Sequence, residues 1–339
     1  MEIDAAKDQL KGLWQRGCRF FGTDYAILGG AMTWVSERNL VGAISNGGGF
    51  GVIACGAMTP EMLDAEITAT AEITDRPFGV NLITMHPDLD QLIDVCIRKQ
   101  VGHIILAGGL PGSTTIERAK SNCAKVVCFA PTLGLAKRLI RQGADALIIE
   151  GAEAGGHIGP VSTSILAQEI LPHIKDVPVF IAGGIGRGDV ILAYLEMGAS
   201  GCQLGTLFVC ADESIAHEKF KNAFIRASAR DAVPSVQLDV QFPVIPVRAL
   251  QNNATREFQQ TQREVIVAVQ RGEIDKEAAQ LKIEHYWSGA LRRAVMDGDV
   301  ETGSLMAGQS VGMVKDIKPT AEIIAKLVAE AVYALEERE

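Results

Sequence analysis

Eight short apolar runs, separated by amphipathic stretches, follow one another between residues 25 and 206 of this 339-residue chain. Runs rich in Val, Ile, Leu and Ala, bounded by glycine and polar residues, are typical of buried parallel strands, and the stretches between them have helical periodicity. Eight strands alternating with helices predict an α/β fold, a (β/α)₈ or TIM barrel. An open doubly wound sheet is the alternative, but no GxGxxG follows the first strand. The expected strands cover residues 25–30, 50–55, 78–84, 103–108, 125–131, 146–151, 178–184 and 201–206.

The remainder of the chain predicts helices and no further strand series. Residues 212–304 are charged, with helical patterns at 255–272 and 276–296. We expect this segment to form a helical insertion or cap, with a separate domain as the alternative. Residues 320–338 are expected to be the last outer helix, and residues 1–20 a leading helix. The expected division is a barrel of residues 1–211 and 305–339 and a cap of residues 212–304.

The composition argues against several classes of protein. Hydrophobic residues make up 47% of the chain and aromatic residues 5%, with 35 glycines, which suits a parallel sheet buried on both faces. The net charge is −9 without a basic cluster, so we do not expect nucleic acid as a partner. No apolar run is long enough to cross a bilayer, and the first residues lack a signal pattern. Seven scattered cysteines without a CxxC pair favour reduced thiols in a cytoplasmic protein.

The segment after the sixth expected strand, EGAEAGGHIG at 150–159, carries the first indication of chemistry. Its glycines allow the backbone to approach a ligand closely, and His157 adds a group that exchanges protons near neutral pH. Active sites of such barrels lie at the carboxyl ends of the strands. We therefore predict His157 to be the catalytic residue, with a glycine-rich surface turn as the alternative. Glu150 is expected to orient a ligand or His157, and Glu153 to be solvated.

The loops after the seventh and eighth expected strands predict a phosphate site. Gly183 and Gly184 follow the seventh strand, and Gly205 and Thr206 follow the eighth. In this fold these loops commonly bind phosphate with a helix N-terminus, because free backbone N–H groups and the helix dipole attract an anion. Thr206 would add a hydroxyl donor. We favour phosphate binding over the alternative that the glycines only make short turns.

Seven motifs occur along the chain in a specific order: GGAMTWVS (29–36), ISNGGGFGVI (44–53), RPFGVNL (76–82), EGAEAGGHIG (150–159), AGGIGRG (182–188), QLGT (203–206) and SLMAGQSVGMV (304–314). Their order and spacing resemble the nitronate monooxygenase family, once called 2-nitropropane dioxygenases, and its close relative, the flavin-dependent enoyl-acyl-carrier-protein reductase. The resemblance covers nearly the whole chain. It implies a TIM barrel with a helical subdomain, non-covalently bound FMN and a catalytic histidine at His157. The flavin-binding positions that it implies are Asn81, Gly183, Gly184, Gln203, Gly205 and Thr206.

The residues at the strand ends agree with FMN as the cofactor. The molecule has one phosphate for the loops after the seventh and eighth strands and a flat ring for the barrel mouth. The backbone edge Gly29, Gly30 and Ala31 can hydrogen-bond the ring without side-chain bulk. Glu150 and Gly156 are expected to lie beside it. The protein would position the flavin, which carries the redox chemistry.

Three functions remain open. A nitronate monooxygenase oxidises alkyl nitronates with O₂, and His157 would act as a base towards a nitroalkane or steady the anionic nitronate. An enoyl reductase uses NAD(P)H to reduce an enoyl thioester, and His157 would protonate the product carbon. A non-catalytic flavin-binding protein is the third alternative. The sequence shows no basic patch that could bind an acidic carrier protein, so nitronate monooxygenase ranks first among these three functions. No metal site is expected, since His, Cys and Asp do not occur at metal-ligand spacing, and a homodimer fits this reading.

Overall fold

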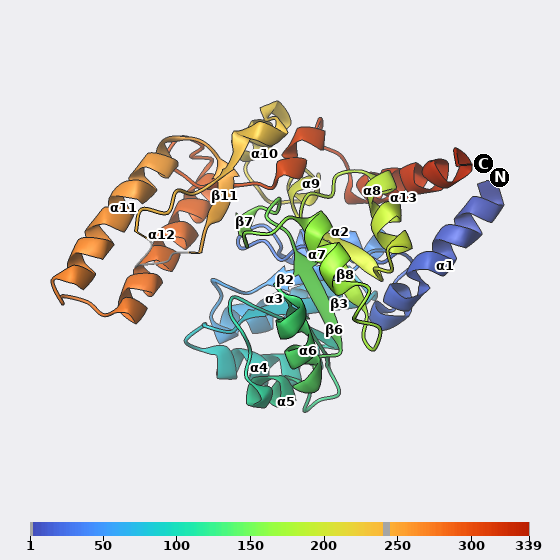
Figure 1. The fold of residues 1–339 in the computed structure, drawn as a ribbon, viewed down its shortest axis with the longest axis horizontal. Coiled ribbons are helices and arrows are strands. Elements are labelled where there is room, and N and C mark those ends of the chain that lie inside the picture. Colours follow the sequence, from blue (N-terminus) through green and yellow to red (C-terminus); the bar gives the residue numbers. More distant parts are fainter. Residues whose placement is uncertain (1–2, 240–244, 339) are drawn as a thin grey trace.

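The computed structural model describes residues 3–239 and 245–338, and its centre is a parallel eight-stranded barrel (Figure 1). The strands pair in the order β1-β9-β8-β6-β5-β4-β3-β2. A parallel bridge between Leu28 and Phe50 brings the two end strands together, which closes the barrel and confirms the predicted TIM fold. Each expected strand encloses an observed one. The strands are β1 (Ile27–Gly29), β2 (Gly51–Ala54), β3 (Phe78–Ile83), β4 (His103–Ala107), β5 (Lys125–Phe129), β6 (Ala146–Glu150), β8 (Val179–Ala182) and β9 (Gly201–Leu204).

Helices surround the barrel and alternate with its strands. Their starts carry the expected signals: Thr59 and Thr132 accept hydrogen bonds from Met62 N and Leu135 N, which caps α3 and α6. The helices are α1 (Ile3–Phe21), α2 (Arg38–Asn46), α3 (Pro60–Ile73), α4 (Leu89–Arg98), α5 (Ser113–Ala119), α6 (Leu133–Arg141), α7 (Thr163–Ile170), α8 (Gly188–Glu196), α9 (Thr206–Val209), α10 (Glu218–Arg226), α11 (Asn253–Gln270), α12 (Lys276–Asp297) and α13 (Thr320–Glu336), with 3₁₀ turns η1 (Ala229–Asp231) and η2 (Gln309–Met313).

The C-terminal helix α13 completes the outer ring, as predicted. It packs against α8, α1 and α2. Gly188 is needed at the contact with α8, because a Cβ on it would lie within 1.9 Å of Leu327 O. The carboxylate of Glu330 also accepts a hydrogen bond from Gly188 N at 2.8 Å. The two chain ends thus lie on the same side of the molecule (Figure 1).

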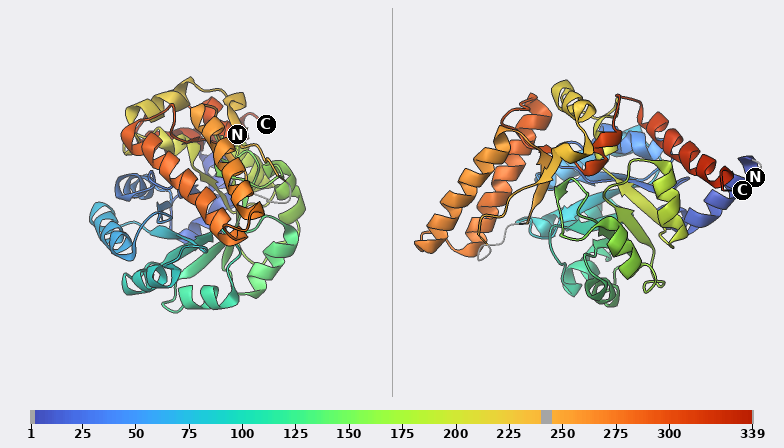
Figure 2. Two further views of the ribbon diagram at one scale, coloured as in Figure 1. Left: turned by 90° about the vertical axis from the view of Figure 1, so that its left-hand side faces the viewer. Right: turned by 45° about the horizontal axis from the view of Figure 1, so that its top comes forward.

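The segment between α9 and α13 contains both helices and short strands. The predicted helices α11 and α12 form an antiparallel pair that projects beyond the barrel (Figure 2). A small core of its own, with Phe258 and Trp287 in ring contact at 4.1 Å, holds the pair together. Helix α10, by contrast, places Phe220 and Phe224 in the main core.

A second, four-stranded sheet lies between the barrel and the helix pair. It consists of β7 (Gly156–His157), β10 (Ala232–Pro234), β11 (Val247–Leu250) and β12 (Leu305–Met306). Strand β11 is central: it pairs antiparallel with β10 on one side and with β12 and β7 on the other. Sequence patterns did not predict this sheet, because strands of two to four residues are too short to show a period. Among the described residues no helix is both long and apolar enough to cross a membrane.

Candidate active site

The predicted site residues lie on the strands and loops at the carboxyl end of the barrel. Gly29 ends β1, Glu150 ends β6, and Asn81 and Gln203 lie within β3 and β9. The strands β1, β9, β8 and β6 are direct neighbours in the barrel, so the loops that follow them are adjacent. The other predicted residues lie on those loops or on the short elements that they lead into: Gly30, Ala31, Gly156, His157, Gly183, Gly184, Gly205 and Thr206.

Backbone segments from β1 and β9 meet closely at Gly30. Gly30 N donates a hydrogen bond to Leu204 O at 2.8 Å. A Cβ on Gly30 would lie 3.3 Å from Gly205 Cα, and one on Gly205 would lie 3.3 Å from the sulfur of Met32. These distances are tighter than ordinary van der Waals contact, and at Gly30 the neighbouring atoms are backbone, so that position favours glycine. The result is a backbone edge without side-chain bulk at the mouth of the barrel.

The turn after β8 requires glycine for a different reason. Gly183 and Gly184 have φ angles of +90° and +74°, a conformation that side chains disfavour. A Cβ on Gly183 would also lie 3.1 Å from Ala154 N, and one on Gly184 would lie 3.1 Å from Glu153 Cβ. Consecutive residues with unusual backbone angles can turn their N–H groups to one side, which is how backbone concavities bind anions.

The loop after β6 is fastened on both sides by Glu153. Its carboxylate accepts hydrogen bonds from Thr163 N at 2.9 Å and Thr163 Oγ1 at 3.0 Å, at the start of α7. Its carbonyl accepts one from Gln309 N at 2.9 Å. The expectation that Glu153 is solvated is therefore wrong: a carboxylate near a helix N-terminus is stabilised by the free N–H groups there. Sequence inspection missed this role because Thr163 lies beyond the loop.

The hydroxyl of Thr206 also contacts the returning chain. Its Oγ1 accepts a hydrogen bond from Gly308 N at 3.0 Å, and Thr206 is 9% exposed. Gly308 lies close as well to the loop after β6, since a Cβ on it would be 2.8 Å from Glu153 O. The motif at 304–314 thus packs against the loop after β6 and the loop after β9.

His157 is held in the small sheet and is solvent-exposed. It pairs with Val247, and Gly156 pairs with Arg248, across the antiparallel contact of β7 and β11. Ile158 N donates a further hydrogen bond to Pro246 O at 2.9 Å. The inserted segment therefore fixes the backbone of the predicted catalytic histidine, and this support could not be foreseen from residues 150–159 alone.

Arg248 reinforces the same turn through its side chain. It is 7% exposed, and its Nε donates to Ala152 O at 2.9 Å while Nη1 donates to Ala232 O at 2.5 Å. Burial lowers the pKa of the guanidinium, and the nearby Glu153 acts in the opposite direction. The arginine thus links the loop after β6 to β10 and adds a positive charge beside the site.

The polar groups on the barrel strands differ in their surroundings. Asn81 is 5% exposed and its Nδ2 donates to Ile105 O at 3.1 Å.

Burial raises the pKa of the Glu150 carboxyl to about 7, and the nearby His157 acts to lower it. A carboxyl with that pKa changes its protonation near neutral pH, which is common for groups at functional sites. Cys55 is inert, because burial raises the pKa of its thiol to about 12.

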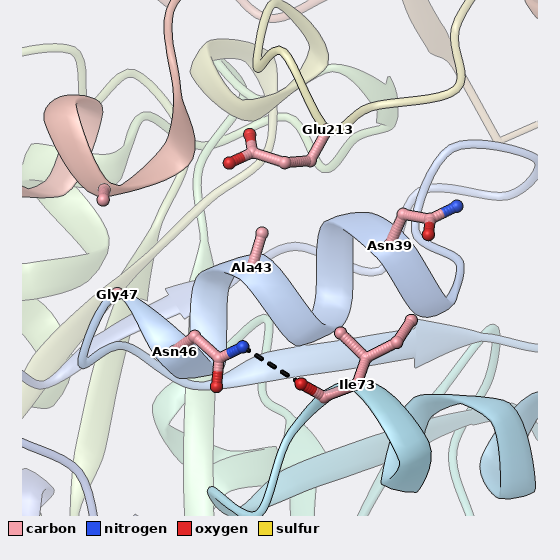
Figure 3. A pocket seen from close by; sticks show the side chains of 7 residues that line it. Asn39, Ala43, Asn46, Gly47, Ile73 and Glu213 are labelled. Atoms are coloured by element: carbon pink, nitrogen blue, oxygen red, sulfur yellow. Dashed lines mark hydrogen bonds between the residues drawn. The ribbon is translucent and has the colours of Figure 1, made fainter.

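Other parts of the described chain offer less to a ligand than the strand ends do. Within residues 3–239 and 245–338, no three His, Cys, Asp or Glu side chains are placed to hold a metal ion. A groove of about 390 Å³ runs along the outside of α2, where Asn46 donates to Ile73 O at 3.2 Å (Figure 3). The charged residue in its lining, Glu213, already accepts hydrogen bonds from Thr320 at the start of α13. The groove lies among the outer helices and not at the strand ends.

Comparisons with known proteins complete the description of the site. The family model described as Nitronate monooxygenase matches residues 15–96 and 88–330. FabK from Thermotoga maritima is 35% identical, with a TM-score of 0.85 over 95% of this chain and 97% of that one. A nitroalkane oxidase from Streptomyces ansochromogenes is 26% identical, with a TM-score of 0.78 over 94% and 98%.

Two curated relatives are similar over nearly their whole length. The (3aS,4S,5R,7aS)-5-hydroxy-7a-methyl-1-oxo-octahydro-1H-indene-4-carboxyl-CoA dehydrogenase of Rhodococcus jostii is 28% identical over 93% of this chain and 95% of the relative. A probable nitronate monooxygenase of Staphylococcus saprophyticus is 27% identical over 91% and 94%.

Proposed function

This chain is an oxidoreductase of the nitronate monooxygenase family, and from that membership we propose that it binds FMN and uses His157 to move a proton to or from a substrate carbon. The observation that carries the proposal is the position of His157. It is exposed on β7 and anchored by β11, and it follows β6, whose neighbour β8 ends in the glycine turn of Gly183 and Gly184. A group that exchanges protons near neutral pH is thereby held beside a backbone site for an anion.

The residues present fit FMN. The close contact of Gly30 with Gly205 leaves a flat backbone edge for an aromatic ring. The positive φ angles of Gly183 and Gly184 suit a turn that binds a phosphate. The strand ends offer this one phosphate-binding turn, and no GxGxxG dinucleotide motif follows β1. Both points support FMN, which has one phosphate, over FAD.

The flavin, when bound, supplies the redox chemistry of the reaction. The chain's own residues supply position and proton transfer. His157 would take the proton from a carbon made acidic by an adjacent nitro or carbonyl group, or return one to it. Burial raises the pKa of the Glu150 carboxyl to about 7, and Glu150 lies close enough to His157 for the imidazole to act against that rise. Arg248 keeps the His157 turn in place through Ala152 O.

Alkyl nitronates with O₂ are the substrates that we propose first. The support is the match to the family and the similarity to the nitroalkane oxidase and the probable nitronate monooxygenase. The chain is also acidic, with a net charge of −9, which disfavours docking of an acidic carrier protein.

Acyl thioesters, with NAD(P)H as the partner, are the second candidate. The specific observation is the similarity to a carboxyl-CoA dehydrogenase over 93% of this chain. A thioester carbonyl acidifies the neighbouring carbon as a nitro group does, so His157 would serve both reactions. Among enzymes that act on acyl thioesters, the sequence motifs of this chain resemble those of the enoyl-acyl-carrier-protein reductase.

The flavin is tested first. The purified protein is expected to be yellow and to release FMN, not FAD, on heating. Gly184→Val should lose the flavin and keep the fold, because the side chain would meet Glu153 in a backbone conformation with φ +74°. Gly159→Val is the matched control, since nothing lies within 4 Å of a Cβ there. A colourless wild-type protein that FMN does not reconstitute would refute the proposal.

The substrate class is tested with the oxidised holoprotein under anaerobic conditions. Addition of an alkyl nitronate should reduce the flavin absorbance, while NADH and NADPH should change it slowly or not at all. Rapid bleaching by a nicotinamide, with reoxidation by crotonyl-coenzyme A and no response to nitronate, would reverse the order of the two candidates.

A further inference from the structure

Trp34 has a backbone conformation that its side chain disfavours. Its φ angle is +68°, in the left-handed region, where a bulky residue is an outlier that its surroundings must hold in place. The residue lies in the loop from β1 to α2, four positions after Gly30. Strained residues of this kind gather at functional sites, so the contacts of Trp34 are informative.

The indole of Trp34 contacts the projecting helix pair. Its Nε1 donates a hydrogen bond to Ser288 O on α12, at 3.3 Å. The guanidinium of Arg292, one helical turn later, lies 5.8 Å from the ring centroid, within range of a cation–π interaction. Both partners belong to α12, whereas Trp34 belongs to the barrel. The contact therefore joins two parts of the molecule that are far apart in the sequence.

The loop that carries Trp34 is rigidly connected to the backbone edge at Gly30. The buried Ser36 donates from Oγ to Gly30 O at 2.8 Å and accepts from Met32 N at 3.0 Å. Val35 N and Ser36 N both donate to Met32 O, at 3.0 and 2.8 Å. These hydrogen bonds connect the edge at Gly30 to the turn that carries Trp34.

We propose that Trp34 is a positioning residue that couples a ligand at the edge Gly29–Ala31 to the docking of α12. This inference rests on the proposed FMN site for the identity of the ligand. A flavin ring lying against the edge would stabilise the turn, the turn would stabilise the indole, and the indole would hold α12 over the mouth of the barrel. By linkage, docking of α12 strengthens ligand binding by the same factor.

Trp34 differs in this respect from the other tryptophans. Trp14 and Trp287 are 3% and 4% exposed and belong to the main and the small core. Trp34 is only partly buried: it packs against the edge of the main core and directs its N–H to a carbonyl that is already part of a helix. A purely packing role would give no reason to keep an indole at a position where glycine is free of strain.

The first test measures amide hydrogen exchange of α12 in the flavin-free protein. Trp34→Gly relieves the strained backbone but removes the contact with α12. The amide hydrogens of α12 should then exchange about tenfold faster, because the loss of one hydrogen bond and one cation–π contact makes opening of the helix more favourable by about that factor. Trp34→Phe keeps a ring and should show a smaller increase, and Arg292→Met breaks the contact from the other side. Arg271→Met is the control, because that arginine, at the end of α11, pairs with Glu273 in the turn before α12 and not with Trp34. Unchanged exchange of α12 in Trp34→Gly would overturn the proposal.

The second test adds FMN to the same proteins. Binding should slow the exchange of α12 in the wild type and in Arg271→Met, and should leave it unchanged in Trp34→Gly even where the flavin is retained. Equal slowing in the wild type and in Trp34→Gly would overturn the coupling. Should the wild type fail to bind FMN, the proposed function fails, while the flavin-free comparison still decides whether Trp34 holds α12.

Discussion

His157 shows how a residue on a very short strand receives a fixed position. Its backbone pairs with Val247 in the inserted segment, and the side chain is exposed. His157→Ala should keep the flavin and lower turnover by about 10² to 10⁴-fold, the usual contribution of one placed acid or base. Steady-state kinetics with a neutral nitroalkane measures the loss. His173→Ala, at another exposed histidine, is the control, and turnover of His157→Ala within a few-fold of wild type would make His157 structural.

Glu150 adds a pH dependence whose sign follows from its pKa. Burial raises that pKa from 4.5 to about 7, so between these values the folded state holds a proton that the unfolded state releases. The resulting stabilisation is complete below pH 4.5 and is lost as the pH rises through 7. Glu150→Gln stays neutral throughout. Its melting temperature, measured without flavin, should rise relative to wild type between pH 4.5 and 7.5, and a constant difference would contradict the raised pKa.

The elements divide into those that the sequence predicts and those that it does not. The eight barrel strands and the helices α11, α12 and α13 were predicted because their apolar periods are long and regular. Helix α7, by contrast, covers Thr163–Ile170, and these bounds do not follow from its apolar pattern. It ends at Ile170 because Pro172, two residues later, has no N–H to continue the helical hydrogen bonds, and its start is fixed by Glu153, ten residues earlier in the chain.

The candidate site was predictable only where local chemistry marks it. Glycines with positive φ and an exposed histidine can be recognised from the residues next to them, as at Gly183 and His157. The supports come from remote segments: Arg248 reaches Ala152, and Trp34 reaches Ser288. Such contacts depend on the path of the whole chain, and no short window of sequence contains both partners.

The small sheet should respond as a unit to the loss of Arg248. Arg248→Met keeps much of the buried stem but removes the donors to Ala152 O and Ala232 O. The loss of two hydrogen bonds from a charged donor should lower the free energy of unfolding of this sheet by on the order of 3 kcal/mol. Hydrogen exchange of residues 154–158 should accelerate and turnover should fall, while the barrel strands stay protected. Arg256→Met, at an exposed position on α11, is the control, and unchanged exchange at 154–158 would refute the role.

At the scale of the whole molecule, the two ends of the barrel serve different needs. The carboxyl end carries exposed and titrating groups, whereas the opposite end is closed by Phe20 and Phe21 from α1, packed against His103 at the start of β4. His103 is 9% exposed and its Nε2 contacts Phe20 O at 2.9 Å. Its place among these aromatic rings, away from the carboxyl end, gives this histidine a structural role.

This closed end predicts how the fold fails in acid. Burial lowers the pKa of His103 from 6.5 to about 4, so between these values the unfolded state binds a proton that the folded state excludes. Stability therefore falls as the pH drops through this window, by on the order of 3 kcal/mol. His103→Gln keeps a hydrogen-bond donor for Phe20 O but does not titrate. Urea unfolding from pH 7 to 4 should show a shallower acid loss for His103→Gln than for wild type. The same slope in both proteins would mean that other groups, and not the histidine beneath the barrel, set the acid limit of the fold.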